Sequence, residues 1–166
     1  MALTRLGVNN ISNSTIANVT TLPAAISTGK VLQVVHGSTN TQTATTSTSY
    51  VASSLAASIT PSSTSSKIAV MFSSTGIWTQ ATTTAVNIGL FRDTTELFVP
   101  QVYISYVTAS VDNQNCVSGS WLDTPSSTSA ISYNLKFKRQ SGSTTVHIQQ
   151  NNSRSTITLM EIEGWL

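Results

Sequence analysis

The side chains that most often do chemistry in enzymes are few and dispersed in this sequence. The histidines are His36 and His147, and they fall in separate segments of the chain. The three aspartates and three glutamates do not cluster, and no HExxH, CxxC or phosphate-binding glycine loop occurs. An active site needs reactive groups that converge, so the sequence predicts no enzyme, no metal site and no cofactor.

Two catalytic arrangements remain formally open. Serines are so frequent that a Ser–His–Asp triad is compatible with the sequence, although no GxSxG motif supports one. A glycosidase pair drawn from Asp93, Asp112, Asp123 and the glutamates is also compatible, but nothing favours it. Asp93 follows Arg92 in the turn-like stretch FRDTTE, which predicts a local ion pair or an Asx turn. Asp123 precedes Thr-Pro and is expected to start a turn.

Two tryptophans and the cysteine can each be interpreted either as packing residues or as residues that bind or react. Trp78 and Trp121 are expected in the core or at a subunit interface, whereas stacking on the sugar rings of a receptor is the alternative. Cys116 is the single cysteine, so no intramolecular disulfide can form. We expect a small buried hydrophobic residue at this position rather than a reactive thiol.

The composition is polar but almost uncharged. Charged residues make up 8% of the 166 positions, against roughly 25% in typical soluble domains, while Ser and Thr number 27 each. The eight basic residues are scattered and the net charge is +2, so we expect no nucleic-acid partner. Their densest group, LysPheLysArg at 136–139, alternates with apolar residues and predicts a solvated strand face. No apolar stretch approaches 18 residues, so no membrane partner is expected.

Short β-type segments separated by turn signals recur from Lys30 onward. No helical period is visible, and ISYNLKFK alternates cleanly between apolar and polar side chains. The pattern predicts an all-β fold, an antiparallel β-sandwich resembling a jelly roll. Pro100 indicates an edge or bulge position in its strand. The predicted strands are 30–35, 49–59, 67–78, 85–92, 96–107, 116–122, 131–138, 144–150 and 156–163.

The hexapeptide TPSSTS occurs at 60–65 and again at 124–129. Each copy lies between two predicted strands, so both are expected to be loops at one rim of the sandwich, with an internal duplication as the alternative. The last strand changes phase, because Glu161 shares a face with Ile157 and Leu159. Either this strand is partly buried on both faces, or a bulge lies near Leu159.

Residues 1–29 follow neither the helical nor the strand period and are expected to form an N-terminal attachment arm, with the β-sandwich domain at 30–166. Trp165 and Leu166 are expected at an interface with another subunit. The apolar residues assigned to attachment are Leu3, Leu6, Val8, Ile11, Ile16, Val19 and Leu22.

Several longer stretches resemble one kind of viral module. The segments GKVLQVVHGSTNTQTATTSTSYVASSLAASITPSSTSSKIAVMFS, IGLFRDTTEL, SWLDTPSSTSAISYNLKFK and STITLMEIEG are similar to virion structural proteins of tailed bacteriophages, especially marine phages and cyanophages. The likeness covers roughly residues 29–164 and is one of composition and pattern. It implies a β-sandwich that often forms trimers, and it supplies no catalytic residues.

The resemblance implies a location on the virion surface and leaves two roles open. A capsid decoration or cement protein would clamp the major capsid protein, or another virion protein, with its arm and would display the sandwich. A tail fibre or receptor-binding protein would instead contact a glycan on the host surface. We favour decoration, because the sequence is short and shows no long repetitive shaft. We expect a homotrimer, because the module is fibre-like, the arm is apolar and the sequence ends in Trp-Leu. A polysaccharide depolymerase is the third alternative, and the dispersed carboxylates count against it.

Overall fold

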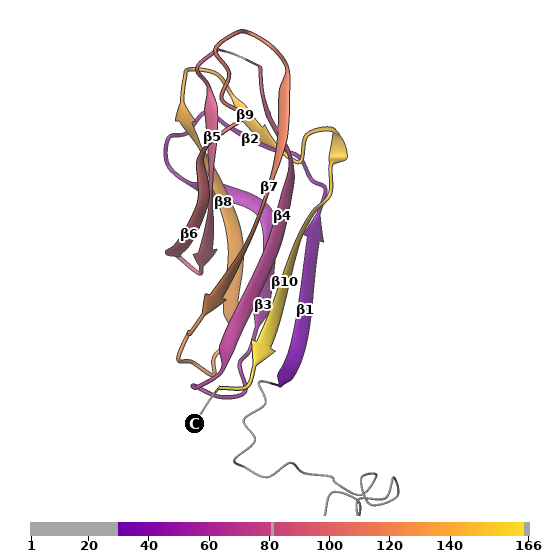
Figure 1. Ribbon diagram of the computed structural model, residues 1–166, viewed down its shortest axis with the longest axis vertical. Helices are drawn as coiled ribbons and strands as arrows, with labels where there is room; N and C mark the ends of the chain where they lie inside the picture. Colours follow the sequence, from indigo (N-terminus) through magenta and orange to yellow (C-terminus); the bar gives the residue numbers. More distant parts are fainter. Residues whose placement is uncertain (1–29, 81, 165–166) are drawn as a thin grey trace, which may run out of the picture.

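The computed structural model describes residues 30–80 and 82–164, which form ten strands and one short 3-10 helix (Figure 1). The residues assigned to the arm (Leu3, Leu6, Val8, Ile11, Ile16, Val19 and Leu22) and to the C-terminal interface (Trp165 and Leu166) lie outside the described residues. The elements are β1 Val31–Thr39, β2 Thr43–Thr45, β3 Val51–Ile59, β4 Lys67–Thr79, β5 Ala85–Arg92, β6 Thr95–Ile104, β7 Asn113–Asp123, β8 Ile131–Ser141, β9 Val146–Ile148, η1 Gln150–Asn152 and β10 Ser155–Ile162.

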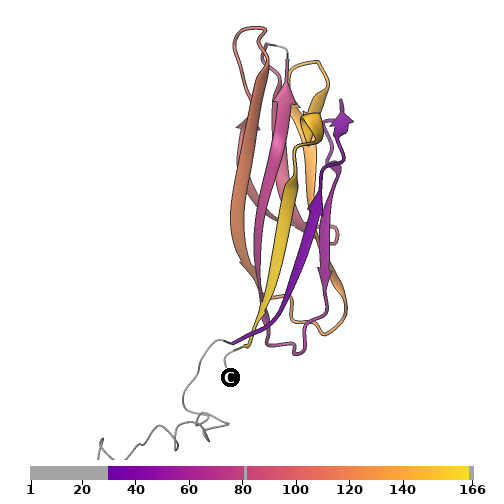
Figure 2. The same cartoon turned by 90° about the vertical axis from the view of Figure 1, so that its right-hand side faces the viewer.

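The strands form two antiparallel sheets that face each other (Figures 1 and 2). The first has the order β1-β10-β4-β9-β2, and β7 pairs with β4 on the side opposite β10 and β9. The second has the order β3-β8-β5-β6. Most connections cross from one sheet to the other, which is the winding of a jelly roll. The predicted all-β, jelly-roll-like sandwich is therefore confirmed. The nine predicted strands are all present, and the short strand β2 was missed because TAT carries no apolar alternation.

The core lies between the sheets and follows the alternation of the sequence. In β8, Ile131, Tyr133, Leu135 and Phe137 are buried while their neighbours are only half-buried. Side chains at alternate positions of β4 and β10 meet them from the other sheet, as expected for two sheets about 10 Å apart. The largest fully buried apolar side chains are Tyr133, Phe137, Leu55, Ile68, Ile77, Ile88, Leu90, Leu135, Ile148, Ile157 and Leu159.

Both copies of TPSSTS lie at the same end of the sandwich, as predicted. The loop at 60–66 joins β3 to β4 and the loop at 124–130 joins β7 to β8, both at the bottom of Figure 1. Strand β1 begins and β10 ends at this end too, since Val31 pairs with Ile162 and the backbone N–H of Glu163 donates to Lys30 O at 2.9 Å. We call it the arm end, and the opposite end, with the connections at 105–112, 142–145 and 149–154, the far end.

Two predictions about strand irregularities had different outcomes. Pro100 lies in β6, the edge strand of the second sheet, whose pairing with β5 is interrupted by register shifts, so the edge prediction is confirmed. Of the two alternatives for the last strand, the bulge near Leu159 is excluded, because β10 keeps one continuous register with β4 from Thr156 to Ile162. Partial burial on both faces is confirmed, because the residues between the buried ones are half-buried. Glu161 consequently points into the sandwich.

Among residues 30–80 and 82–164, we find no helix whose length and apolar character would let it cross a lipid bilayer.

Candidate functional site

Glu161 is a fully buried carboxylate that joins three elements at the arm end. Its Oε1 accepts hydrogen bonds from the Ser62 backbone N–H at 2.7 Å, the Ser62 hydroxyl at 2.6 Å and the Ser66 hydroxyl at 2.7 Å. Its Oε2 accepts one from Gln33 Nε2 at 2.5 Å, and that amide also donates to Thr60 O. The first copy of TPSSTS is therefore fastened to β1 and β10 where the chain passes toward residues 1–29.

The hydrogen bonds to Glu161 decide its protonation. Burial by itself would raise the pKa of this carboxyl, but the donors from Ser62, Gln33 and Ser66 outweigh burial and lower the pKa to about 2. The carboxylate is thus ionised at neutral pH, and its four hydrogen bonds hold the surrounding loop in place. Its acceptor oxygens are occupied by protein donors, so the residue fastens the loop.

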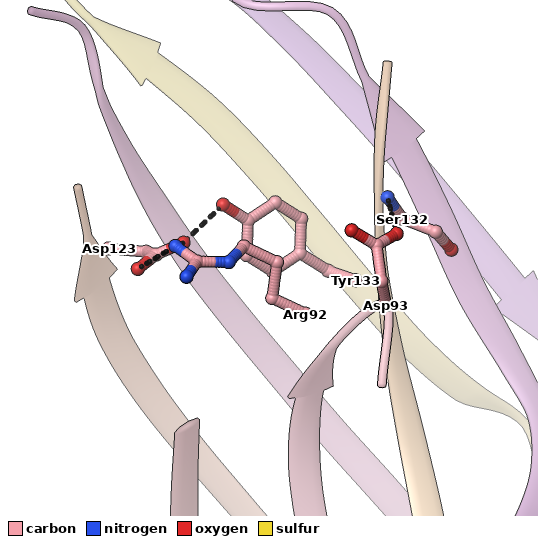
Figure 3. Close-up of polar contacts among 5 residues, drawn as sticks. All are labelled: Arg92, Asp93, Asp123, Ser132 and Tyr133. Atoms are coloured by element: carbon pink, nitrogen blue, oxygen red, sulfur yellow. Dashed lines mark hydrogen bonds and ion pairs between the residues drawn. The ribbon is translucent and has the colours of Figure 1, made fainter. Parts of the chain in front are cut away.

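A second polar cluster links the two sheets (Figure 3). Arg92 Nη1 lies 3.0 Å from Asp123 Oδ1 and 2.9 Å from Asp123 Oδ2, and the Tyr133 hydroxyl donates to Oδ2 at 2.7 Å. Asp123 ends β7 of the first sheet, whereas Arg92 and Tyr133 belong to the second sheet. Burial, followed by the hydrogen bond to Asp123, raises the pKa of Tyr133. The cluster contains a largely buried ion pair that ties the sheets together beside the second TPSSTS copy.

Two expectations for the aspartates are corrected by this cluster. Asp123 does not start a turn, because it is buried and its carboxylate is occupied by Arg92 and Tyr133. Arg92 accordingly forms no ion pair with its neighbour Asp93. Asp93 instead has a left-handed backbone, with φ of 51°, and its Oδ1 accepts from the Ser132 backbone N–H at 3.1 Å. Both carboxylates are used for structure.

The remaining reactive side chains are separated. His36 is exposed on β1 beside Thr158, and His147 lies on β9, where burial lowers its pKa. Within the described part of the chain, no three His, Cys, Asp or Glu residues come close enough to hold a metal ion. Cys116 is exposed on β7, so the expectation that it is buried is wrong. An exposed position is possible because β7 is an edge strand with one open face.

An apolar row crosses the outer face of the first sheet near the arm end. Val34 pairs with Met160, Met160 with Ala69, and Ala69 with Leu122, so these four side chains lie side by side on four strands. Val34 and Leu122 are 56% and 53% exposed. We call these four residues the apolar row. The alternation of each strand can predict that its residue faces outward, but only the register of the four strands shows that these residues are neighbours.

The next row on this face is also uncharged, since His36, Thr158, Met71 and Ser120 pair in the same order. The outer face of the second sheet differs. There the Lys136 ammonium lies 4.4 Å from the Phe91 ring centroid, and Lys138 lies 4.5 Å from that of Tyr50. In the LysPheLysArg segment the lysines thus lie half-buried on the outer strand face, as the predicted alternation requires, while Phe137 points into the core. Lysine side chains therefore cover apolar surface on the outer face of the second sheet, whereas apolar side chains on the outer face of the first sheet remain exposed.

Comparisons with known proteins give structural neighbours only. No protein-family model matches this sequence, and no curated protein sequence is similar to it. The VP2 protein of infectious bursal disease virus, as a point mutant in T=1 particles, is similar with 12% identity and a TM-score of 0.44 over 78% of this chain and 36% of that one. The VP2 subviral particle gives 12% identity and a TM-score of 0.43 over 80% and 40%. The Gx strain structure gives 14% identity and a TM-score of 0.40 over 80% and 38%. This chain thus spans about two fifths of the length of these viral proteins.

Proposed function

We propose that this protein is a non-enzymatic structural component of a virion, a decoration or cement protein that binds the head of a tailed phage through residues 1–29. The observation that carries the proposal is where the sandwich connects to residues 1–29. Residue 30 and residue 164 both lie at the arm end of an elongated sandwich, so an anchor there leaves the far end to project from the shell (Figures 1 and 2). The resemblance to phage virion modules supports the same role.

Two features of the sandwich suit a role that is purely architectural. The core and the two buried carboxylates hold the arm end together through hydrogen bonds and one ion pair, away from bulk solvent. Surface ion pairs, which weaken in salt, contribute little to such a fold. Among the described residues, the histidines and carboxylates are too far apart to suggest a catalytic site, which supports a structural role.

We also propose that copies of the protein associate as a homotrimer through the outer face of the first sheet. In a ring of three, one patch of each copy contacts a different patch of the next copy. The exposed ends of the apolar row, Val34 on β1 and Leu122 on β7, can form such a contact without like-charge repulsion. Exposed apolar side chains that lie together mark such contacts, whereas single ones do not. The lysine-covered second sheet lacks this property, which favours the first sheet as the interface.

A lysine in place of Leu122 should convert the trimer to monomers. Leu122 is exposed in one chain, so the variant should fold normally, and a charge in the interface would be desolvated without a partner. Light scattering coupled to size exclusion measures the mass, with Val102→Lys on edge strand β6 as the control that keeps the trimer. A wild-type monomer at micromolar concentration would refute self-association. A trimer that persists in Leu122→Lys but is lost on deleting residues 1–28 would assign the contact to the arm.

Deletion of residues 1–28 should leave the sandwich folded and abolish attachment to heads. The described strands make their pairings without this segment, so cooperative thermal unfolding should be retained. The measurement is co-sedimentation with phage heads that lack the protein. Saturable binding of the full chain and none of the truncated chain is the expected result. Equal binding of both chains would contradict the role of the arm, and loss of cooperative unfolding would show that the arm belongs to the core.

A tail fibre or receptor-binding protein is the second candidate. Trp78 favours it, because this side chain lies half-buried at the far end, edge-on to the His147 ring, where it can stack on a sugar ring. In the same sedimentation experiment, binding to host cells but not to heads would decide for this role.

A further inference from the structure

An aromatic side chain lies at the far end on the outer face of the first sheet. Trp78 pairs with His147 of β9 on one side and with Gln114 of β7 on the other. The His147 ring meets the indole edge-on, with ring centroids 4.8 Å apart and planes inclined by 65°. This contact fixes the plane of the indole, while Trp78 itself remains only half-buried.

Two hollows flank Trp78, with volumes of about 390 Å³ and 460 Å³. Both include Gln80; the first continues to His147 and three hydroxyl side chains, the second to Gln114, Gln150 and Asn151. Trp78 supplies the apolar surface of both, because the other described residues that line them are polar. Asp112 is the one carboxylate among these residues. We call the two hollows together the Trp78 groove.

The loop that carries Gln150 and Asn151 is held rigidly against β4. The Gln149 backbone N–H donates to Thr75 O at 3.0 Å, and the buried Gln149 side chain donates to Ser155 Oγ at 2.9 Å. A Cβ at Gly76 would lie 2.5 Å from Gln150 N, so only glycine permits this approach. The groove is therefore organised before any ligand binds, which lowers the cost of binding.

Backbone strain accompanies this arrangement. Gln149, Asn151 and Asn152 all have left-handed φ, at 54°, 56° and 56°, which costs free energy in residues other than glycine. In addition, Gln150 Oε1 is buried and has no hydrogen-bond donor among the described residues. Strained backbone and an unpaired buried acceptor beside an aromatic ring are typical of binding sites rather than of inert loops.

The lining chemistry selects the class of ligand. An apolar ligand would need mostly hydrophobic walls, and a nucleic acid would need basic side chains; the described residues of the groove supply neither. A sugar ring presents an apolar C–H face to an aromatic ring and a rim of hydroxyls to amides, and Trp78 with Gln114, Gln150 and Asn151 offers both. The carboxylate of Asp112 disfavours acidic sugars. One carboxylate is also too few for hydrolysis by a carboxylate pair.

We propose that the Trp78 groove binds a neutral saccharide, with one sugar ring stacked on the indole and its hydroxyls bonded to the amides of Gln114 and Asn151. The site lies at the end opposite the proposed attachment to the virion. It would let the displayed domain adhere to a glycan-covered surface, whether the protein decorates a head or forms part of a tail. The inference depends on the groove alone and stands or falls separately from the virion role.

The test follows the three tryptophan indole N–H signals by NMR while the full-length protein is titrated with neutral sugars. The probes are glucose, galactose, mannose, N-acetylglucosamine and their disaccharides, with glucuronate as the acidic comparison. The signal absent in Trp78→Phe identifies Trp78. We expect that signal to move saturably with at least one neutral sugar at millimolar concentration, while that of Trp121 stays fixed and glucuronate binds more weakly.

Variants separate binding from folding. Asn151→Gly removes the amide but tolerates the left-handed backbone, and it should weaken binding about 10-fold, as loss of one hydrogen bond predicts. Asn152→Gly makes the same backbone change at a residue outside the groove and should bind normally. The proposal is overturned if no sugar in the panel moves the Trp78 signal, if all indole signals move together, or if Asn151→Gly and Gln114→Ala both bind like the wild type.

Discussion

Replacing Glu161 with alanine should lower the free energy of unfolding by about 3 kcal/mol, because hydrogen bonds to a buried charged group are worth more than neutral ones. The substitution leaves the Ser66 hydroxyl buried without its acceptor and frees the loop that carries Ser62. Gln33 keeps its bond to Thr60 O, so β1 should suffer less than the loop. Urea unfolding followed by tryptophan fluorescence measures the difference.

The matched control is Glu163→Ala, which removes an exposed carboxylate two residues farther along the chain. It should change the stability by less than about 0.5 kcal/mol, as surface substitutions usually do. If the free energy of unfolding falls by the same small amount in both variants, the hydrogen bonds to Glu161 do not stabilise the arm end.

The pH dependence of stability gives an independent measure of the same contacts. The pKa of Glu161 is about 2 in the folded protein, compared with an ordinary value of 4.5. The stabilisation is therefore complete above about pH 4.5 and is lost as the pH falls toward 2. Glu161→Gln should flatten the stability curve in this window, and an unchanged acid transition in that variant would contradict the lowered pKa.

The fold could be predicted because strand periodicity is a local property. ISYNLKFK shows its buried face directly, and Pro100 indicates an edge strand through its missing N–H donor. Glu161 left the same reasoning undecided, since a charge in phase with Ile157 and Leu159 suggested either burial on both faces of the strand or a bulge. Its partners, Ser62 and Ser66, lie in a loop almost 100 residues earlier, and no local pattern reveals that such a loop donates to a buried carboxylate.

The candidate surfaces were harder to predict, because they depend on register. The apolar row needs the alignment of four strands, which sequence alternation does not specify. Trp78 faces outward because Gly76, with φ of 61°, shifts the phase of β4, so that Ile77 is buried next to it. The sequence contains the aromatic residue and the polar residues of the groove, but they converge because four loops and three strands meet at one end of the fold.

The second large effect is expected for Asp123→Ala, which should destabilise the protein by about 3 kcal/mol through the loss of a largely buried ion pair. The Tyr133 hydroxyl would be fully buried without an acceptor, and Arg92, whose side chain is 28% exposed, would turn partly to water. That exposure places the expected loss at the lower end of the range for buried pairs. Tyr133→Phe removes one hydroxyl and should cost about 1 kcal/mol.

A double-mutant cycle between Arg92→Met and Asp123→Asn decides whether the pair links the two sheets. Asparagine retains an acceptor for Tyr133, so the coupling energy reports the charge interaction between Arg92 and Asp123. We expect a coupling above about 1 kcal/mol, because Asp123 is almost completely shielded from solvent. A coupling near zero would mean that the charge interaction between Arg92 and Asp123 does not help to hold the sheets together. Asp123 would then act across the sandwich only as an acceptor for the Tyr133 hydroxyl.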